Sequence, residues 1–191
     1  MKAPVRRQFR QAGDYMLPGN NPARQCDEAL CRVRDGDMTG LETIYNMLGR
    51  RIYMLALSVL KDTESAKDVM QETFVRLVNG AHAYRDGSNA QAYILAVTRN
   101  LAIKLLSSRS RELSYENIDE DARGTVGIDS NKPLSALDAL SLLDAEDRQL
   151  VVLRLDGNMK FREIAPILGI SPDACRKRYQ RALSKLKTYY S

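Results

Sequence analysis

The segment at residues 161–179 leaves little choice of local fold, because its turn residues specify two crossed helices. Gly169 can adopt the left-handed backbone of a tight turn, Ser171 is placed to cap the next helix, and Pro172 suits the first position of that helix. Pro166 removes a backbone hydrogen bond from the first helix, so we expect that helix to start late or to bend. The segment predicts a helix-turn-helix.

The second helix of this pair separates apolar from polar residues. One stripe is apolar and should be buried (Cys175, Tyr179, Ala182, Leu183 and Leu186), and the other faces are polar (Arg176, Lys177, Gln180, Arg181 and Lys185). From Pro172 onward the chain has six basic residues and one acid. Positive charge favours phosphate contact, and Arg and Gln can pair with guanine and adenine edges in a major groove. A basic, solvated helix in an ordinary helical bundle is the alternative.

The rest of the chain also follows a helical period. Apolar residues recur every three or four positions from about residue 25 to 106 and again after residue 133, and alternating strand patterns are absent from the sequence. We expect helices at 40–59, 63–79, 88–107, 134–143, 145–155, 161–168 and 172–189. The third of these should begin with a capping box of Ser88 and Gln91. The predicted fold class is all-α.

The helical period fails in an acidic stretch. Residues 112–130 contain six acids, one basic residue and two glycines, which is typical of a linker. We therefore predict a flexible basic arm at 1–24, a helical domain at 25–110, a flexible acidic linker at 111–132 and a second helical domain at 133–191.

Composition excludes several classes of protein. The 191 residues contain three cysteines without a Cys-x-x-Cys pair and a single histidine, so we expect no disulfide framework, no metal site and no cofactor. We find no nucleophile with a base and no glycine-rich phosphate loop, so we expect no enzyme. The sequence lacks a membrane-spanning run and a secretion signal, which predicts a cytoplasmic protein without stable membrane insertion. The net charge of +5 favours a polyanionic partner.

The predicted helix at 63–79 carries a polar face. Asp68, Gln71 and Glu72 share one side, away from the apolar stripe that contains Met70, Phe74 and Leu77. Taken alone, such a face is most often simply solvated.

Taken in order, these parts resemble the extracytoplasmic-function (ECF) group of sigma factors, in the sigma-70 family of bacterial RNA polymerase. The resemblance covers about residues 25–188 and rests on five stretches in order: GD at 36–37, LETIY at 41–45, DVMQETF at 68–74, AYILAVTRNLAI at 92–103, and the acidic stretch with its helix-turn-helix. It implies two small helical domains, a region 2-like domain and a region 4-like helix-turn-helix domain. In that family the first domain binds the clamp helices of core polymerase and melts the minus-10 element, and the second reads the minus-35 element.

The resemblance implies three sets of contact residues. Core polymerase would bind the polar face (Asp68, Gln71, Glu72). The minus-10 DNA would meet a loop and the helix after it (Tyr84, Arg85, Asn89, Tyr93, Arg99, Asn100, Lys104), where aromatic and Arg planes can stack on a flipped base. The minus-35 duplex would meet the last helix (Arg176, Lys177, Arg178, Gln180, Arg181), with Arg178 on a phosphate. The implied partners are core RNA polymerase, promoter DNA and an anti-sigma factor.

A second function stays open from the sequence. The chain could be a stand-alone helix-turn-helix regulator that binds an operator as a dimer and whose N-terminal helices dimerise or sense a ligand. Such a regulator would bind a palindromic site without polymerase.

Overall fold

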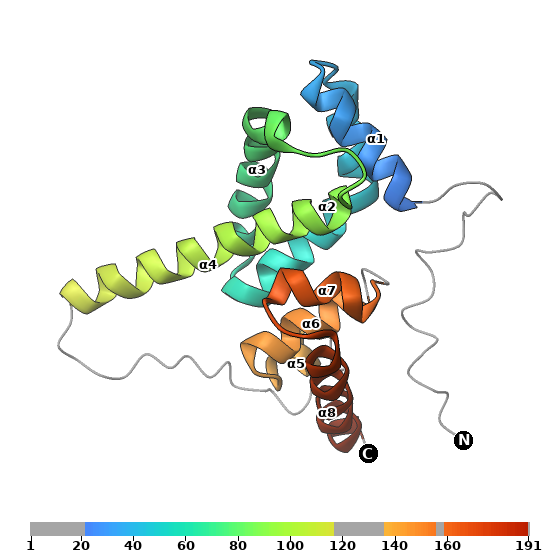
Figure 1. Cartoon of the computed structure of the whole chain (residues 1–191). Helices are drawn as coiled ribbons and strands as arrows, with labels where there is room; N and C mark the ends of the chain where they lie inside the picture. The colour runs from blue at the N-terminus through green and yellow to red at the C-terminus, as the bar shows by residue number, and fades with distance from the viewer. Residues whose placement is uncertain (1–21, 117–135, 156–158, 191) are drawn as a thin grey trace.

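The computed structural model describes residues 22–116, 136–155 and 159–190, and every regular element in those ranges is a helix (Figure 1). The N-terminal group contains α1 (Pro22–Arg34), α2 (Thr39–Leu60), α3 (Thr63–Gly80), a 3-10 turn (Ala81–Ala83) and α4 (Ala90–Glu116). The C-terminal group contains α5 (Ala136–Ser141), α6 (Ala145–Leu155), α7 (Phe161–Leu168) and α8 (Pro172–Tyr190). The predicted all-α class is confirmed. Most of the predicted arm and linker lies outside the described residues.

Helices α2 and α3 follow the predicted spacing because each buries one stripe. The stripe of α2 is fully buried at four positions (Ile44, Leu48, Ile52 and Leu55). Lys61 then turns the chain with a left-handed φ of 57° and ends α2. Asp62 begins α3 by accepting a hydrogen bond from the Ser65 backbone N–H at 2.9 Å.

Helix α1 packs closely against the start of α2. A Cβ added at Gly40 would lie 2.2 Å from the carbonyl oxygen of Ala29, so only glycine permits this approach. Asp37 fixes the entry of the chain by accepting a hydrogen bond from the Thr39 backbone N–H at 2.9 Å. The two helices therefore pack as one unit.

The helix-turn-helix forms as the sequence predicts. Gly169 ends α7 with a φ of 68°, and the Ser171 hydroxyl accepts a hydrogen bond from the Ala174 N–H at 3.2 Å, so that Pro172 is the first residue of α8. The expected late start of α7 is wrong. The helix begins at Phe161 and contains Pro166, whose exposed ring points away from the core.

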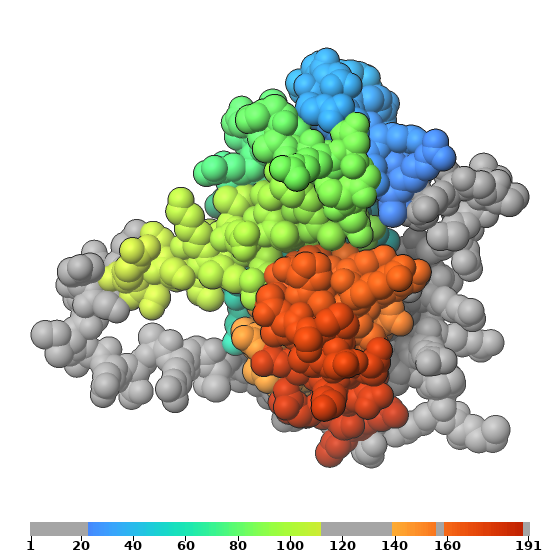
Figure 2. All heavy atoms as spheres, viewed as in Figure 1, coloured from blue at the N-terminus to red at the C-terminus, as the bar shows by residue number. Residues whose placement is uncertain are grey.

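Helix α6 is buried on two sides. Leu150 and Leu153 belong to the same apolar cluster as Ile52 and Leu55 of α2, whereas Val151 packs in a separate cluster with residues of α5, α8 and the turn after α5. In Figure 2 the C-terminal group borders α4 through its orange part, where α7 packs on α4. The two helical groups thus share a core, which the separate domains expected from the sequence did not anticipate.

Two polar contacts cross the same boundary. The buried Arg148 guanidinium donates to the Ser58 carbonyl of α2 at 2.9 Å and to the Leu140 and Leu143 carbonyls of its own group at 2.9 and 2.8 Å. Arg99 of α4 donates from Nε to Gln149 Oε1 of α6 at 2.8 Å. Hydrogen bonds and apolar packing therefore both hold α6 against the first group.

Within the described residues, no helix has an apolar stretch long enough to cross a membrane. In the same ranges, no three His, Cys, Asp or Glu side chains gather into a possible metal site.

Candidate nucleic-acid and polymerase interfaces

The polar face of α3 borders a shallow groove. Asp68 and Gln71 are exposed, and half-buried Glu72 accepts a hydrogen bond from Arg76 Nε at 2.9 Å. A cavity of about 320 Å³ runs between α3 and α4 and is lined by Asp68 and Glu72 on one side and Lys104 on the other. The structure therefore places two of the predicted polymerase contacts beside one of the predicted minus-10 contacts.

The loop before α4 has a buried start and an exposed middle. Tyr84 is only 4% exposed, donates from its hydroxyl to Asp27 Oδ1 at 2.5 Å, and packs against the Tyr93 ring at a centroid distance of 5.5 Å. Burial raises the pKa of the Tyr84 phenol, and the hydrogen bond to Asp27 raises it further. In this conformation Tyr84 belongs to the interior, so it offers no open ring for base stacking. Residues 85–88 are exposed.

The start of α4 differs from the predicted capping box. The N-cap is Asn89, whose Oδ1 accepts a hydrogen bond from the Ala92 N–H at 3.0 Å, while Ser88 donates to the Arg85 carbonyl at 2.5 Å. Asn89 has a φ of 66°, a conformation that asparagine tolerates better than most residues. The Asn89 amide, expected to face a base, is instead engaged in the cap through its oxygen.

The predicted contacts along α4 fall into two groups. Tyr93 and Arg99 are half-buried, and burial lowers the pKa of the Arg99 guanidinium, which is bound to Gln149. Asn100 and Lys104 are exposed. Only these last two present open side chains on the helix in this arrangement, and Arg99 would have to leave Gln149 to reach DNA.

Helix α8 presents its predicted polar side chains to solvent. Arg176, Lys177, Gln180 and Arg181 are exposed, opposite the fully buried Cys175 and Ala182. Arg176 pairs with Asp173 at 2.6 Å, one turn earlier on the same helix. Four of the five predicted minus-35 residues therefore share an open surface.

Acidic residues at the start of α6 contact the basic side of α8. Glu146 pairs with the half-buried Arg178, and Asp147 lies 3.7 Å from Arg181 Nη2 and 3.9 Å from Lys185 Nζ. Asp144 caps α6 by accepting a hydrogen bond from the Asp147 N–H at 2.8 Å, which lowers the pKa of Asp144. Sequence reasoning did not identify these acids, because acidic residues in a first helical turn are common.

Asp147 is the unusual member of this acidic set. Its side chain is fully buried, and neither carboxylate oxygen accepts a hydrogen bond from a described residue. Burial raises its pKa, and the neighbouring Asp144 raises it further. The contact with α8 thus rests on a carboxylate that is poorly solvated.

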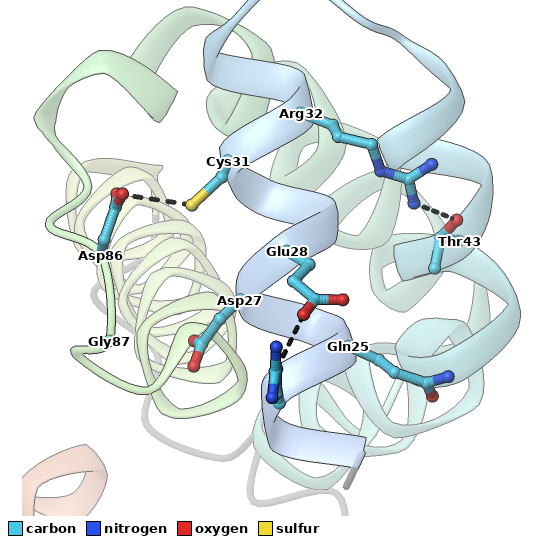
Figure 3. Close-up of a pocket in the computed structure, with 9 residues that line it drawn as sticks. Gln25, Asp27, Glu28, Cys31, Arg32, Thr43, Asp86 and Gly87 are labelled. Atoms are coloured by element: carbon cyan, nitrogen blue, oxygen red, sulfur yellow. Dashed lines mark hydrogen bonds and ion pairs between the residues drawn. The ribbon is translucent and has the colours of Figure 1, made fainter. Parts of the chain in front are cut away.

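A second cavity lies between α1, α2 and the loop before α4. Its volume is about 680 Å³, and Figure 3 shows Asp27 and Cys31 of α1 pointing toward the loop residues Asp86 and Gly87. Cys31 Sγ donates to Asp86 Oδ1 at 3.4 Å, and Arg34 also pairs with Asp86. Arg34 lowers the pKa of Asp86 most, followed by Cys31. Sequence reasoning assigned no role to these α1 residues, since local spacing does not show contacts across 50 or more residues.

Known proteins match both groups of helices. Residues 44–112 match the family described as sigma-70 region 2, and residues 134–186 match the family described as sigma-70, region 4. The RNA polymerase sigma factor CarQ of Myxococcus xanthus is 26% identical over 160 residues, which cover 82% of this chain and 92% of CarQ. The ECF RNA polymerase sigma factor SigM of Bacillus subtilis is 26% identical over 159 residues, which cover 79% of this chain and 95% of SigM.

Two solved structures share the fold. One is CnrH in complex with the cytosolic domain of CnrY, with a TM-score of 0.65 and 20% identity, covering 89% of this chain and 97% of that one. The other is the sigma factor RpoE in complex with the anti-sigma factor NepR from Bartonella quintana, with a TM-score of 0.65 and 20% identity, covering 78% of this chain and 94% of that one.

Proposed function

The chain belongs to the sigma-70 family of RNA polymerase sigma factors, in its ECF group, and from this premise we propose which of its surfaces bind polymerase and which bind promoter DNA. The observation that carries the proposal is helix α8, a capped helix with exposed Arg176, Lys177, Gln180 and Arg181 opposite a buried stripe. The chain works in the cytoplasm, adds promoter specificity to core polymerase and catalyses no reaction itself.

The minus-35 duplex binds along α8. Arg176 and Gln180 contact base edges in the major groove, where Arg pairs with guanine and Gln with adenine. Lys177 and Arg181 contact bases or phosphates, and Arg178 contacts a phosphate after leaving Glu146. The six basic residues from Pro172 onward support this role by attracting the DNA backbone.

Core polymerase binds the groove beside α3. The carboxylate and amide groups of Asp68, Gln71 and Glu72 lie outside the apolar core and are available to a partner. The groove between α3 and α4 offers a concave surface to a partner helix. This use explains why a polar face stands beside a cavity.

Minus-10 DNA binds the exposed part of the loop and of α4. Arg85, Asn100 and Lys104 are open to solvent and can contact bases or phosphates directly. Arg99 joins them once it leaves Gln149. Tyr84 and Asn89 hold the loop in shape, and Tyr93 supports Tyr84 from α4.

An anti-sigma factor is a further partner. RpoE and its anti-sigma factor NepR form one of the two related complexes, and the similarity of fold supports an inhibitor of the same general kind for this chain.

Transcription in vitro tests the proposal. Purified core polymerase with this chain should initiate at a subset of promoters from the source genome, and core polymerase alone should not. The free chain should bind the same promoters weakly. Tight binding of the free chain to a palindromic operator, with no stimulation of core polymerase, would instead support the stand-alone regulator.

Alanine variants test α8 within this assay. Arg176→Ala and Gln180→Ala should each relax the preference at one minus-35 base pair and cost about 1–3 kcal/mol at the preferred base. Lys177→Ala, if it loses a phosphate contact, should weaken all sequences alike and lower the salt slope by about one. Lys187→Ala, about two turns beyond Gln180 on the same helix, removes one of the same six basic residues and is the control for base preference, which it should leave at the wild-type value. Wild-type base preference in both Arg176→Ala and Gln180→Ala would show that α8 does not read the promoter through them.

A further inference from the structure

Helix α1 is fastened to both ends of the loop before α4 by one carboxylate. Asp27 Oδ1 accepts a hydrogen bond from the Tyr84 hydroxyl at 2.5 Å and from the Ala90 backbone N–H at 2.6 Å. These donors lie 57 and 63 residues further along the chain. Asp27 therefore spans the loop, with a contact just before its first exposed residue and a contact at the first residue of α4.

The contact with Ala90 is a helix cap supplied by another helix. The first N–H groups of an α-helix have no partner inside that helix, and Ala90 is the first residue of α4. Hydrogen bonds from such groups to a carboxylate are short and about twice as strong as neutral ones. The negative charge also lies at the positive end of the α4 dipole.

This cap explains how the loop keeps an unfavourable backbone. Asn89 has a φ of 66°, which costs free energy for any residue but glycine and persists when neighbouring contacts over-determine it. The Asp27 bond fixes the peptide after Asn89, and the bond from Ala92 to the Asn89 side chain fixes the first turn of α4. The chain is thus held on both sides of the strained residue.

A second link from α1 is weaker. Asp86 contacts Arg34 and Cys31, and about two thirds of the Asp86 side chain is exposed, so water and salt screen this pair. Asp27, in contrast, is half-buried, and the Tyr84 phenol that binds it is nearly inaccessible to solvent. Of the two links from α1, the one through Asp27 therefore constrains residues 85–88 more strongly.

We propose that Asp27 is a positioning residue for minus-10 recognition, which fixes the exposed loop through Tyr84 and Ala90 and so sets base preference without touching DNA. This inference rests on the proposed function, because it requires that the loop meets minus-10 DNA. It predicts that a substitution on α1 alters the minus-10 base preference of the loop at residues 85–88.

The test compares Asp27 variants in reconstituted holoenzyme. Asp27→Ala removes both contacts, whereas Asp27→Asn keeps an oxygen that can accept the Ala90 N–H. Transcription is measured from promoters that differ at single minus-10 bases, with saturating sigma factor. Asp27→Ala should reduce the ratio of transcription with the best minus-10 base to transcription with the next-best base by about fivefold or more. Fivefold is about the low end of the discrimination that one base contact provides. Asp27→Asn should retain more than half of the wild-type ratio.

Three controls separate positioning from general damage. Core affinity and minus-35 base preference should stay at wild-type values in Asp27→Ala. Glu28→Ala changes the neighbouring acid on α1, which pairs only with Arg24 in the described residues, and should keep the wild-type minus-10 ratio. Tyr84→Phe removes only the phenol contact and should reduce the ratio by about twofold, so it decides the question if Asp27→Ala does not fold.

The outcomes are distinct. A folded Asp27→Ala protein with the wild-type minus-10 ratio overturns the inference, as does Tyr84→Phe with an unchanged ratio. An equal loss at minus-35 and minus-10 bases also overturns it, since that indicates general destabilisation. A wild-type holoenzyme with no minus-10 preference would refute the proposed function itself.

Discussion

Replacing Asp147 with asparagine should stabilise the folded protein. The wild-type carboxylate is 0% exposed and accepts no hydrogen bond from a described residue. Leaving such a group unsatisfied costs about 1–3 kcal/mol, and more when it is charged. Arg181 Nη2 and Lys185 Nζ lie 3.7 and 3.9 Å from the carboxylate oxygens of Asp147, and about half of each basic side chain or more is exposed to solvent. An ion pair with such an exposed partner stabilises the folded state by only about 0.2–1 kcal/mol. We therefore expect Asp147→Asn, which keeps the shape and removes the charge, to gain about 1 kcal/mol at neutral pH.

The gain should depend on pH in one direction. The folded-state pKa of Asp147 is raised above its ordinary value of 3.8, so the unfolded chain releases this proton at a lower pH than the folded protein does. As the pH rises from that ordinary value through the raised one, the wild type loses stability relative to Asp147→Asn. Above the raised pKa the difference in unfolding free energy between the two proteins stays constant. In acid it shrinks toward the small difference between a protonated Asp147 and an asparagine.

Urea denaturation of both proteins between about pH 4 and about pH 7 measures this difference. At neutral pH the expected gain corresponds to a rise in Tm of about 2–4 °C. Glu146→Gln is the matched control, because Glu146 is an exposed acid on the same turn and its replacement should stay within about 0.5 kcal/mol of wild type. An Asp147→Asn protein that is less stable at neutral pH, or equally stabilised across the range, would refute the reasoning.

Three further outcomes are expected. Replacing Gln71 and Glu72 by Ala should lower core affinity in a binding titration while the unfolding free energy changes by less than about 0.5 kcal/mol, because Gln71 is exposed and the Glu72 side chain is 44% exposed; unchanged affinity would remove them from the interface. Arg148→Met should cost about 2–4 kcal/mol in urea denaturation, since three backbone carbonyls lose their donor; a neutral effect would mean that water replaces it. Brief proteolysis should cut within 112–130, and the fragments should co-elute in gel filtration because α6 packs on α2; separate elution would contradict that packing.

Local signals were enough to predict most helices. The bounds of α7 and α6 match the expected ranges, and α8 differs from its range by one residue. These elements depend on apolar spacing, a glycine in the left-handed region and a serine cap, all of which act within a few residues of the chain. The same locality explains why Arg176, Lys177, Gln180 and Arg181 were correctly expected on exposed faces.

Contacts between distant segments were not predictable in the same way. Tyr84 looked available for stacking because nothing near it in sequence shows that Asp27 binds its hydroxyl. Asn89 and Ser88 are both good caps, and nothing near them in sequence shows that Asn89 caps α4 or that Asp27 binds the N–H of Ala90. One long-range signal was present in the sequence. The four consecutive apolar residues at 150–153 leave α6 without a polar side there, which is typical of a helix buried on two faces.

The double burial of α6 makes the two groups of helices energetically interdependent. Separating α6 from α2 would expose the apolar surface of Leu150 and Leu153 at a cost of about 25 cal/mol per Å². A partner that binds only the separated form must supply that free energy. Its apparent affinity is therefore its intrinsic affinity multiplied by the small fraction of molecules that are already separated. For such a partner, a substitution that loosens α6 would act in two opposite directions, lowering the stability of the free protein and raising the apparent affinity of the complex.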